Sequence, residues 1–311
     1  MNILQKHFKF LVRIKPQFCI FENEKNPFET KTQTAKSYLS DQKYLNQEYD
    51  IVRLQTEELE KCLGLKIGQF IQIQNQNQKA IDCYPISRID DCGIIDLVVK
   101  KQALNNNVMK DSEVQEQETQ KDQNKQNQNN NNSSSQEKQQ GQSQIKDVKN
   151  LQEIQIKGPK TKFVYDGFGN VIYKLGDEVV TKNFDYIGII CENVNITKMF
   201  SLIEGISTNG DPTNLSIIQF CRTLDDMVLA DEILWLKEQQ KINYKVFLEN
   251  VDINFPSLKG SLDQKFVKDY LPPSDLNALI VTAGQTSFNE KSKTILKELG
   301  YNEQNIIQID E

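Results

Sequence analysis

Histidine and cysteine are the side chains best suited to nucleophilic, acid–base and metal chemistry, and their number and spacing limit what this chain can do. The chain has a single histidine, His7, which argues against a Ser–His–Asp triad, a Cys–His pair and a multi-histidine metal site. None of its six cysteines forms a Cys-x-x-Cys pair, and their spacing matches no zinc or iron–sulfur pattern (Cys19, Cys62, Cys83, Cys92, Cys191 and Cys221). The sequence therefore predicts no metal site, no nucleophilic catalytic residue, and separate thiols in a reducing compartment.

Charge and hydropathy exclude two further classes of partner. The net charge of −6 argues against a general nucleic-acid-binding protein, which needs a basic face. No apolar run is long enough to span a bilayer, so we expect no transmembrane segment.

The N-terminus has a composition of its own. Residues 1–20 contain no Asp or Glu, and Lys6, Lys9 and Arg13 fall on the opposite side of a helical wheel from the apolar side chains. A basic, acid-poor amphipathic segment is typical of mitochondrial targeting, so residues 1–38 are predicted to be an N-terminal extension of a mitochondrial protein. The alternative is a short surface helix or tail on a cytoplasmic protein.

Short strand-like segments follow, and they predict an antiparallel β-barrel over residues 39–183. Residues 68–73 alternate between apolar and polar side chains, and residues 93–100 are β-branched and apolar. Residues 163–165 and 171–173 flank a glycine-rich turn and predict a hairpin. The barrel is interrupted at residues 105–147 by a Gln/Asn-rich insertion that is too polar to pack, and we expect this insertion to be disordered.

Residues 184–311 change to strand–helix alternation, which predicts an α/β domain whose parallel sheet carries helices on both faces. The expected strands are 186–191, 215–221, 244–248 and 278–282, and the expected helices are 196–206, 229–240, 266–270 and 287–299.

A β-barrel domain followed by such an α/β domain resembles the ferredoxin–NADP reductase superfamily, and local segments resemble its cytochrome b5 reductase branch. Residues 84–87 (Tyr-Pro-Ile-Ser) and 90–100 resemble the flavin strand and the strand after it, and residues 187–190 and 279–284 resemble strands of the nicotinamide domain. The resemblance covers roughly residues 40–105 and 150–311. It implies FAD, NADH and redox chemistry.

The flavin motif of that family is degenerate here. Tyr84 stands where the family packs a tyrosine on the flavin ring, and Ser87 is a second remnant. Asp82 replaces the arginine that neutralises the FAD diphosphate, and Pro85 follows Tyr84 directly where the family has Ser or Thr. The family's Gly-Lys-Met-Ser turn should fall within residues 105–150, and nothing there matches it.

The nucleotide motif is degenerate as well. Residues 192–198 replace the family's Gly-Gly-Thr-Gly-Ile-Thr-Pro loop, so that all three glycines are missing, Glu192 adds a negative charge, and Thr197 remains. An asparagine tolerates a left-handed backbone, so we expect the turn itself to persist. In the family's last motif, Cys-Gly-Pro-Pro, the glycine is kept as Gly284, but Ala283 replaces the cysteine that lies beside the nicotinamide.

These losses favour a non-catalytic protein without a cofactor, an accessory subunit bound to protein partners in a larger, mitochondrial respiratory assembly. The alternative is a divergent FAD- and NADH-dependent oxidoreductase of the cytochrome b5 reductase type. A small-ligand sensor with one remodelled pocket is a third hypothesis.

Overall fold

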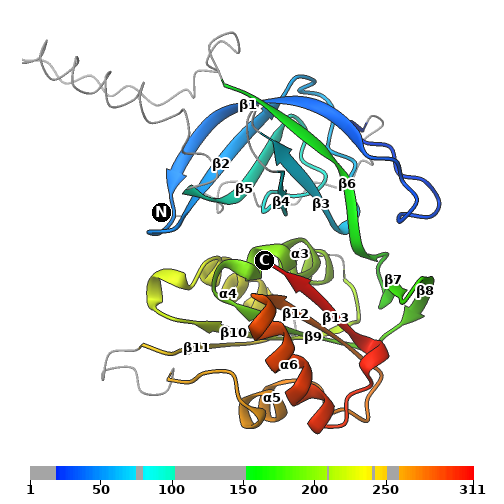
Figure 1. Cartoon of the computed structure of the whole chain (residues 1–311), viewed down its shortest axis with the longest axis vertical. Coiled ribbons are helices and arrows are strands. Elements are labelled where there is room, and N and C mark those ends of the chain that lie inside the picture. Colours follow the sequence, from blue (N-terminus) through cyan, green and yellow to red (C-terminus); the bar gives the residue numbers. More distant parts are fainter. Residues whose placement is uncertain (1–18, 75–79, 102–151, 209, 240–241, 251–258) are drawn as a thin grey trace, which may run out of the picture.

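The computed structural model describes residues 19–74, 80–101, 152–208, 210–239, 242–250 and 259–311, which form two stacked domains (Figure 1). The predicted insertion at 105–147 and most of the predicted targeting segment lie outside these residues. Among the described residues, no helix is long and apolar enough to cross a membrane.

The first domain is an antiparallel sheet that curls into a near-barrel. Its strand order is β4-β3-β6-β1-β2-β5, and an isolated bridge between Pro85 and Leu97 joins its two edges. The six strands are β1 (Gln33–Tyr44), β2 (Tyr49–Thr56), β3 (Ile67–Gln74), β4 (Ile81–Cys83), β5 (Ile94–Lys100) and β6 (Glu153–Tyr165). The predicted barrel is therefore confirmed, although β1 begins before the predicted domain start at residue 39.

Alternating apolar side chains of these strands fill the inside of the barrel. Val52, Leu54, Ile71, Leu97 and Ile156 are all essentially inaccessible to solvent and share one cluster. This is what a two-residue side-chain period produces when one face of a sheet is buried.

A hairpin connects the barrel to the second domain. β6 pairs with β7 (Asn170–Leu175) across the glycine-rich turn, as predicted, and β7 pairs in turn with β8 (Glu178–Asn183). Tyr165 fixes this corner, because its hydroxyl donates to Asp211 Oδ2 (2.6 Å) and accepts from Gly169 N (3.0 Å).

The second domain is a five-stranded parallel sheet in the order β11-β10-β9-β12-β13. Its elements are β9 (Tyr186–Glu192), η3 (Asn193–Met199), α3 (Phe200–Thr208), β10 (Asn214–Cys221), η4 (Leu224–Asp226), α4 (Ala230–Gln239), β11 (Ile242–Leu248), α5 (Gln264–Tyr270), β12 (Ala278–Gly284), α6 (Thr286–Glu298), η6 (Glu303–Asn305) and β13 (Ile306–Asp310). Every predicted strand and helix of this domain is present, and β13 is an additional strand.

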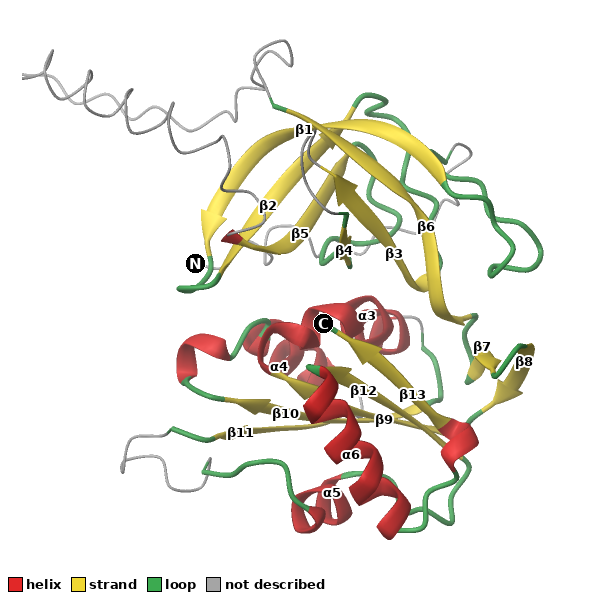
Figure 2. Cartoon of the chain, viewed as in Figure 1, coloured by secondary structure: helices red, strands yellow, loops and turns green. Residues whose placement is uncertain are grey.

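Helices cover both faces of this sheet, as predicted. α3 and α4 lie on the face toward the barrel, whereas α5 and α6 lie on the other face (Figure 2). One apolar cluster runs from the barrel residues Phe70 and Tyr84 through Ile203 of α3 into the sheet. The two domains therefore share a continuous core.

Candidate functional site: the cleft between the domains

A cavity of about 660 Å³ lies between the barrel and the α/β domain. The barrel contributes Tyr84 and Lys100 to its wall, and the α/β domain contributes Thr197, Lys198 and Glu311. The structure thus brings together Tyr84 and Thr197, two of the four remnant residues predicted from the family motifs.

Tyr84 presents an aromatic ring to this cleft. It follows β4, is 7% exposed, and stacks on Phe70 with ring centroids 4.8 Å apart and an interplanar angle of 22°. Burial raises the pKa of Tyr84, and the charge of Asp82 adds to the rise, so the phenol stays neutral. A fixed neutral ring at a cavity wall is suited to packing against a planar aromatic ligand.

Asp82 lies on the same wall, where the family motif has an arginine. Its Oδ1 accepts a hydrogen bond from Gln72 Nε2 at 2.7 Å. An acidic group on this wall would repel a diphosphate.

Two lysines in the cleft were not singled out from the sequence. Lys198 Nζ donates to Asp310 O at 2.6 Å, and Lys100 forms an ion pair with Glu311. Burial lowers the pKa of Lys198 to about 8, although the negative charges of Glu311 and Asp310 act in the opposite direction and raise it. The cleft therefore holds two ammonium groups next to its carboxylates, and an anionic ligand could exchange places with Glu311.

Ser87 and Gly284 have packing roles. Ser87 lies outside the cavity lining, and its Oγ accepts a hydrogen bond from Asp96 N at 3.1 Å, which ties the segment after β4 to β5. A Cβ at Gly284 would lie 2.5 Å from Phe288 Cδ1 and 3.1 Å from Glu192 Cβ, so only glycine fits this position.

The order in which strands are added to the sheet reverses between β9 and β12. Ligands of open α/β sheets bind at such a switch point. Glu192 ends β9, and its Oε2 accepts a hydrogen bond from Gln285 N, 3.0 Å away at the N-terminus of α6. A carboxylate of the protein thus accepts a hydrogen bond from a backbone N–H at a helix N-terminus, the kind of group that commonly binds phosphate.

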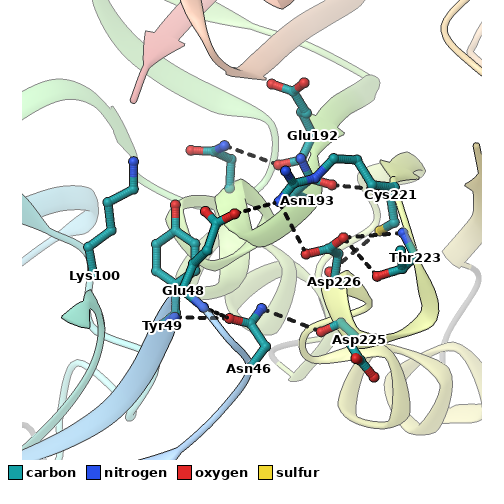
Figure 3. Close-up of polar contacts among 12 residues, drawn as sticks. Asn46, Glu48, Tyr49, Lys100, Glu192, Asn193, Cys221, Thr223, Asp225 and Asp226 are labelled. Carbon is teal, nitrogen blue, oxygen red and sulfur yellow. Dashed lines mark hydrogen bonds and ion pairs between the residues drawn. The ribbon is translucent and has the colours of Figure 1, made fainter. Parts of the chain in front are cut away.

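The loop after Glu192 keeps its turn without glycines. Asn193 has φ 48°, which confirms the expected left-handed backbone, and its Oδ1 accepts from Arg222 N at 3.0 Å. Asn195 Nδ2 donates to Glu192 O at 3.0 Å. Hydrogen bonds of two asparagine side chains therefore stabilise this loop (Figure 3).

The same region carries polar contacts between the domains (Figure 3). Arg222 Nη2 lies 3.0 Å from Glu48 Oε1 in the turn between β1 and β2, and Asn46 Nδ2 donates to Asp225 O at 3.4 Å. Because Glu48 and Arg222 are exposed, their ion pair contributes at most about 1 kcal/mol to the stability of the domain interface. The shared apolar core is therefore the main constraint on domain orientation.

A smaller cavity of about 260 Å³ opens at the carboxyl ends of β9 and β10. Arg222 and Lys291 line it together with Glu192 and Glu249. The cations suit a dinucleotide, whereas the carboxylates oppose it. Among the residues placed by the structure, no group of three or more His, Cys, Asp or Glu side chains could hold a metal ion.

The charge of Glu192 predicts a pH dependence of dinucleotide binding. Burial raises the pKa of Glu192, the hydrogen bond from Gln285 N lowers it, and the charges of Glu311 and Glu249 raise it further. Protonation removes a repelling charge, so affinity for NAD⁺ should increase as pH falls through this raised pKa. Titration calorimetry at several pH values measures this, and Glu192→Gln should flatten the dependence. An equally steep dependence in that variant would assign the effect to another group.

Comparisons with known proteins agree with this fold. Residues 36–165 match the family described as the oxidoreductase FAD-binding domain. NADH-cytochrome b5 reductase 2 of Danio rerio is 26% identical over 254 residues, covering 78% of this chain and 74% of that protein. The solved cytochrome b5 reductase domain of Ulva prolifera nitrate reductase superposes with a TM-score of 0.67 at 18% identity, covering 89% of this chain and 97% of that domain. A flavohemoglobin of Malassezia yamatoensis, solved with bound FAD and heme, has a TM-score of 0.57 at 14% identity, covering 89% of this chain and 60% of that one.

The fold is therefore that of the ferredoxin reductases, and the predicted fold class is confirmed. Residues 36–165 are similar to oxidoreductase FAD-binding domains, and most of the chain is distantly similar to the NADH-cytochrome b5 reductases. The predicted loss of both cofactors stays a prediction.

Proposed function

We propose that the protein is an oxidoreductase of the cytochrome b5 reductase type that holds FAD in the cleft between its domains and takes electrons from NADH. The observation that carries this proposal is the cavity of about 660 Å³ with the Tyr84 ring on its wall. The homologues support this function better than they support a non-catalytic subunit.

The residues of the cleft fit FAD in three respects. The volume lies within the range of about 300–1,000 Å³ that is usual for small-molecule sites. Tyr84 offers a ring for the isoalloxazine, and Val98 and Val194 add apolar surface. Lys100 and Lys198 can bind the anionic phosphates once Glu311 is displaced, which compensates for the arginine that Asp82 replaces.

The fit for NADH is poorer. Arg222 and Lys291 could bind its phosphates or ribose, but Glu192 holds the N–H at the switch point. When held in this cleft, FAD would supply the redox chemistry that links a two-electron donor, NADH, to a one-electron acceptor such as a heme protein. Tyr84 would orient the flavin, and the two lysines would balance the charge of its phosphates. We expect dinucleotide binding to be weak.

A Tyr84 series tests this function. Tyr84→Ala should weaken FAD binding by about tenfold, because a ring contact contributes about 0.5–1.5 kcal/mol beyond its buried area. Tyr84→Phe keeps the ring, and it should bind FAD as the unchanged protein does. Fluorescence titration of the refolded, flavin-free protein measures both. Equal FAD affinity in all three proteins, or no FAD binding in any of them, would refute the assigned site.

The second candidate is a non-catalytic subunit of a larger, mitochondrial assembly. The acidic groups at both phosphate positions, Asp82 and Glu192, support it, and the basic N-terminal residues 1–20 support the location. Purification under mild conditions separates the candidates. A flavin-free protein recovered only with stoichiometric partners would favour the subunit.

A further inference from the structure

Three cysteines from distant parts of the sequence lie next to one another in the barrel domain. Isolated β-bridges pair Cys19 with Cys62 in parallel and Cys62 with Cys92 in antiparallel orientation. The Sγ atoms of Cys19 and Cys62 lie 3.5 Å apart. This arrangement lies outside both cavities described above, and neither cofactor explains it.

Backbone hydrogen bonds hold the segment that follows Cys19 against the segment that contains Cys62. Ile20 N donates to Cys62 O at 2.9 Å, and Phe21 N donates to Leu63 O at 3.0 Å. Phe21 is 1% exposed and packs in the barrel core. Neighbouring strand segments lie about 4.7–4.9 Å apart, which is within the range of about 4.4–6.8 Å that the Cα atoms of a disulfide span. Rotation of the side chains alone can therefore bring the two sulfur atoms into bonding distance.

We propose that Cys19 and Cys62 are a modification site at which a low-molecular-weight disulfide, such as oxidised glutathione, introduces a reversible intramolecular disulfide. The Cys19 thiolate attacks one sulfur of the glutathione disulfide, forms a mixed disulfide and releases one glutathione thiolate. The Cys62 thiolate then attacks Cys19 Sγ and releases the second glutathione. Two protein thiols are oxidised, one glutathione disulfide is reduced to two thiols, and two protons leave the protein.

Exposure sets the order of these two steps. Cys19 is exposed and can meet a solute, whereas Cys62 is 2% exposed. Burial raises the pKa of Cys62 to about 12, so it reacts poorly with an external disulfide. Once Cys19 carries the glutathione, Cys62 is already adjacent, and the second step gains from its high effective concentration.

Cys92 is the competing partner and provides the control. It is exposed, and its Sγ lies 3.8 Å from Asp90 O, while the close thiol contact joins Cys19 and Cys62. A disulfide between Cys19 and Cys62 encloses all of β1 and β2, and cross-links that close long loops restrict the unfolded chain most.

The test equilibrates the full chain with glutathione buffers of graded reduced-to-oxidised ratio, followed by acid quenching, alkylation and tryptic mass spectrometry. Cys19, Cys62 and Cys92 fall in separate tryptic peptides: 14–25, 62–66 and 89–100. We expect peptides 14–25 and 62–66 to become linked together as the buffer becomes more oxidising, and dithiothreitol to release them.

Three variants make the outcome specific. Cys92→Ser should form the same link, Cys62→Ser should stop at a glutathione adduct on Cys19, and Cys19→Ser should leave peptide 62–66 alkylated throughout. A link between peptides 62–66 and 89–100, or a glutathione adduct on Cys19 of the unchanged protein without any link, would overturn the proposal.

Discussion

Glu192→Gln should strengthen NADH binding by about tenfold. Two unit charges about 5 Å apart repel each other by about 3 kcal/mol at an effective dielectric constant of about 20. Glu192 is only half-buried, so solvent screening reduces this repulsion to about 1.5 kcal/mol, which corresponds to one factor of ten in the dissociation constant. The amide oxygen of the new glutamine is also a weaker acceptor than the Glu192 carboxylate, so a phosphate can compete more easily for the hydrogen bond from Gln285 N. Titration calorimetry with NADH measures the change.

The matched control for this variant is Glu298→Gln. It removes the same charge from the last turn of α6, at the opposite end of the helix from Gln285. We expect its NADH affinity to equal that of the unchanged protein. If both variants improve binding equally, net charge is responsible and Glu192 has no special position at the switch point.

Gly169→Ala should lower the free energy of unfolding by about 3 kcal/mol or more, because the alanine side chain has no room at the corner between the domains. Gly169 has φ +78°, and a Cβ there would lie 2.1 Å from Phe184 O. That carbonyl belongs to backbone that is fixed by a hydrogen bond from Phe184 N to Gly169 O (2.9 Å). The cost therefore combines a left-handed conformation with a backbone clash. Urea denaturation measures the loss.

Gly167→Ala is the control, since it lies in the same turn. Its φ is +88°, but no atom lies within 4 Å of a Cβ built there. Only the conformational cost of about 1–2 kcal/mol applies. Similar losses in the two variants would contradict the role assigned to the Phe184 carbonyl.

The α/β domain was predictable from the sequence because its buried strands are short apolar runs between amphipathic helices. β9 and β12 are examples, as nearly every residue in them is buried. β1 was harder to predict. Its sequence, QTAKSYLSDQKY, is mostly polar. The strand is held by backbone hydrogen bonds to β2 and β6, and such bonds leave no hydrophobic pattern in the sequence. β13 is an edge strand whose side chains are mostly half-buried, so its pattern is also weak.

The site was predictable only where a local motif marks it. Tyr84 and Thr197 follow from such motifs, and both line the cleft. Lys198 and Glu311 could not be found in this way, because their proximity depends on how the end of the chain folds back beside η3. Conversely, Ser87 and Gly284 match the motifs for reasons of packing, since a hydrogen bond to Asp96 N and a close contact with Phe288 require them.

Anaerobic mixing of the FAD-loaded protein with NADH tests whether the chain is a flavin-dependent NADH oxidoreductase. An oxidoreductase of the cytochrome b5 reductase type should retain the flavin through gel filtration, and NADH should bleach its visible absorption, faster in Glu192→Gln because dinucleotide binding is then stronger. Oxidised cytochrome b5 added afterwards should restore the absorption. A protein that retains no flavin, or a bound flavin that NADH reduces in neither the unchanged protein nor the variant, would contradict the account.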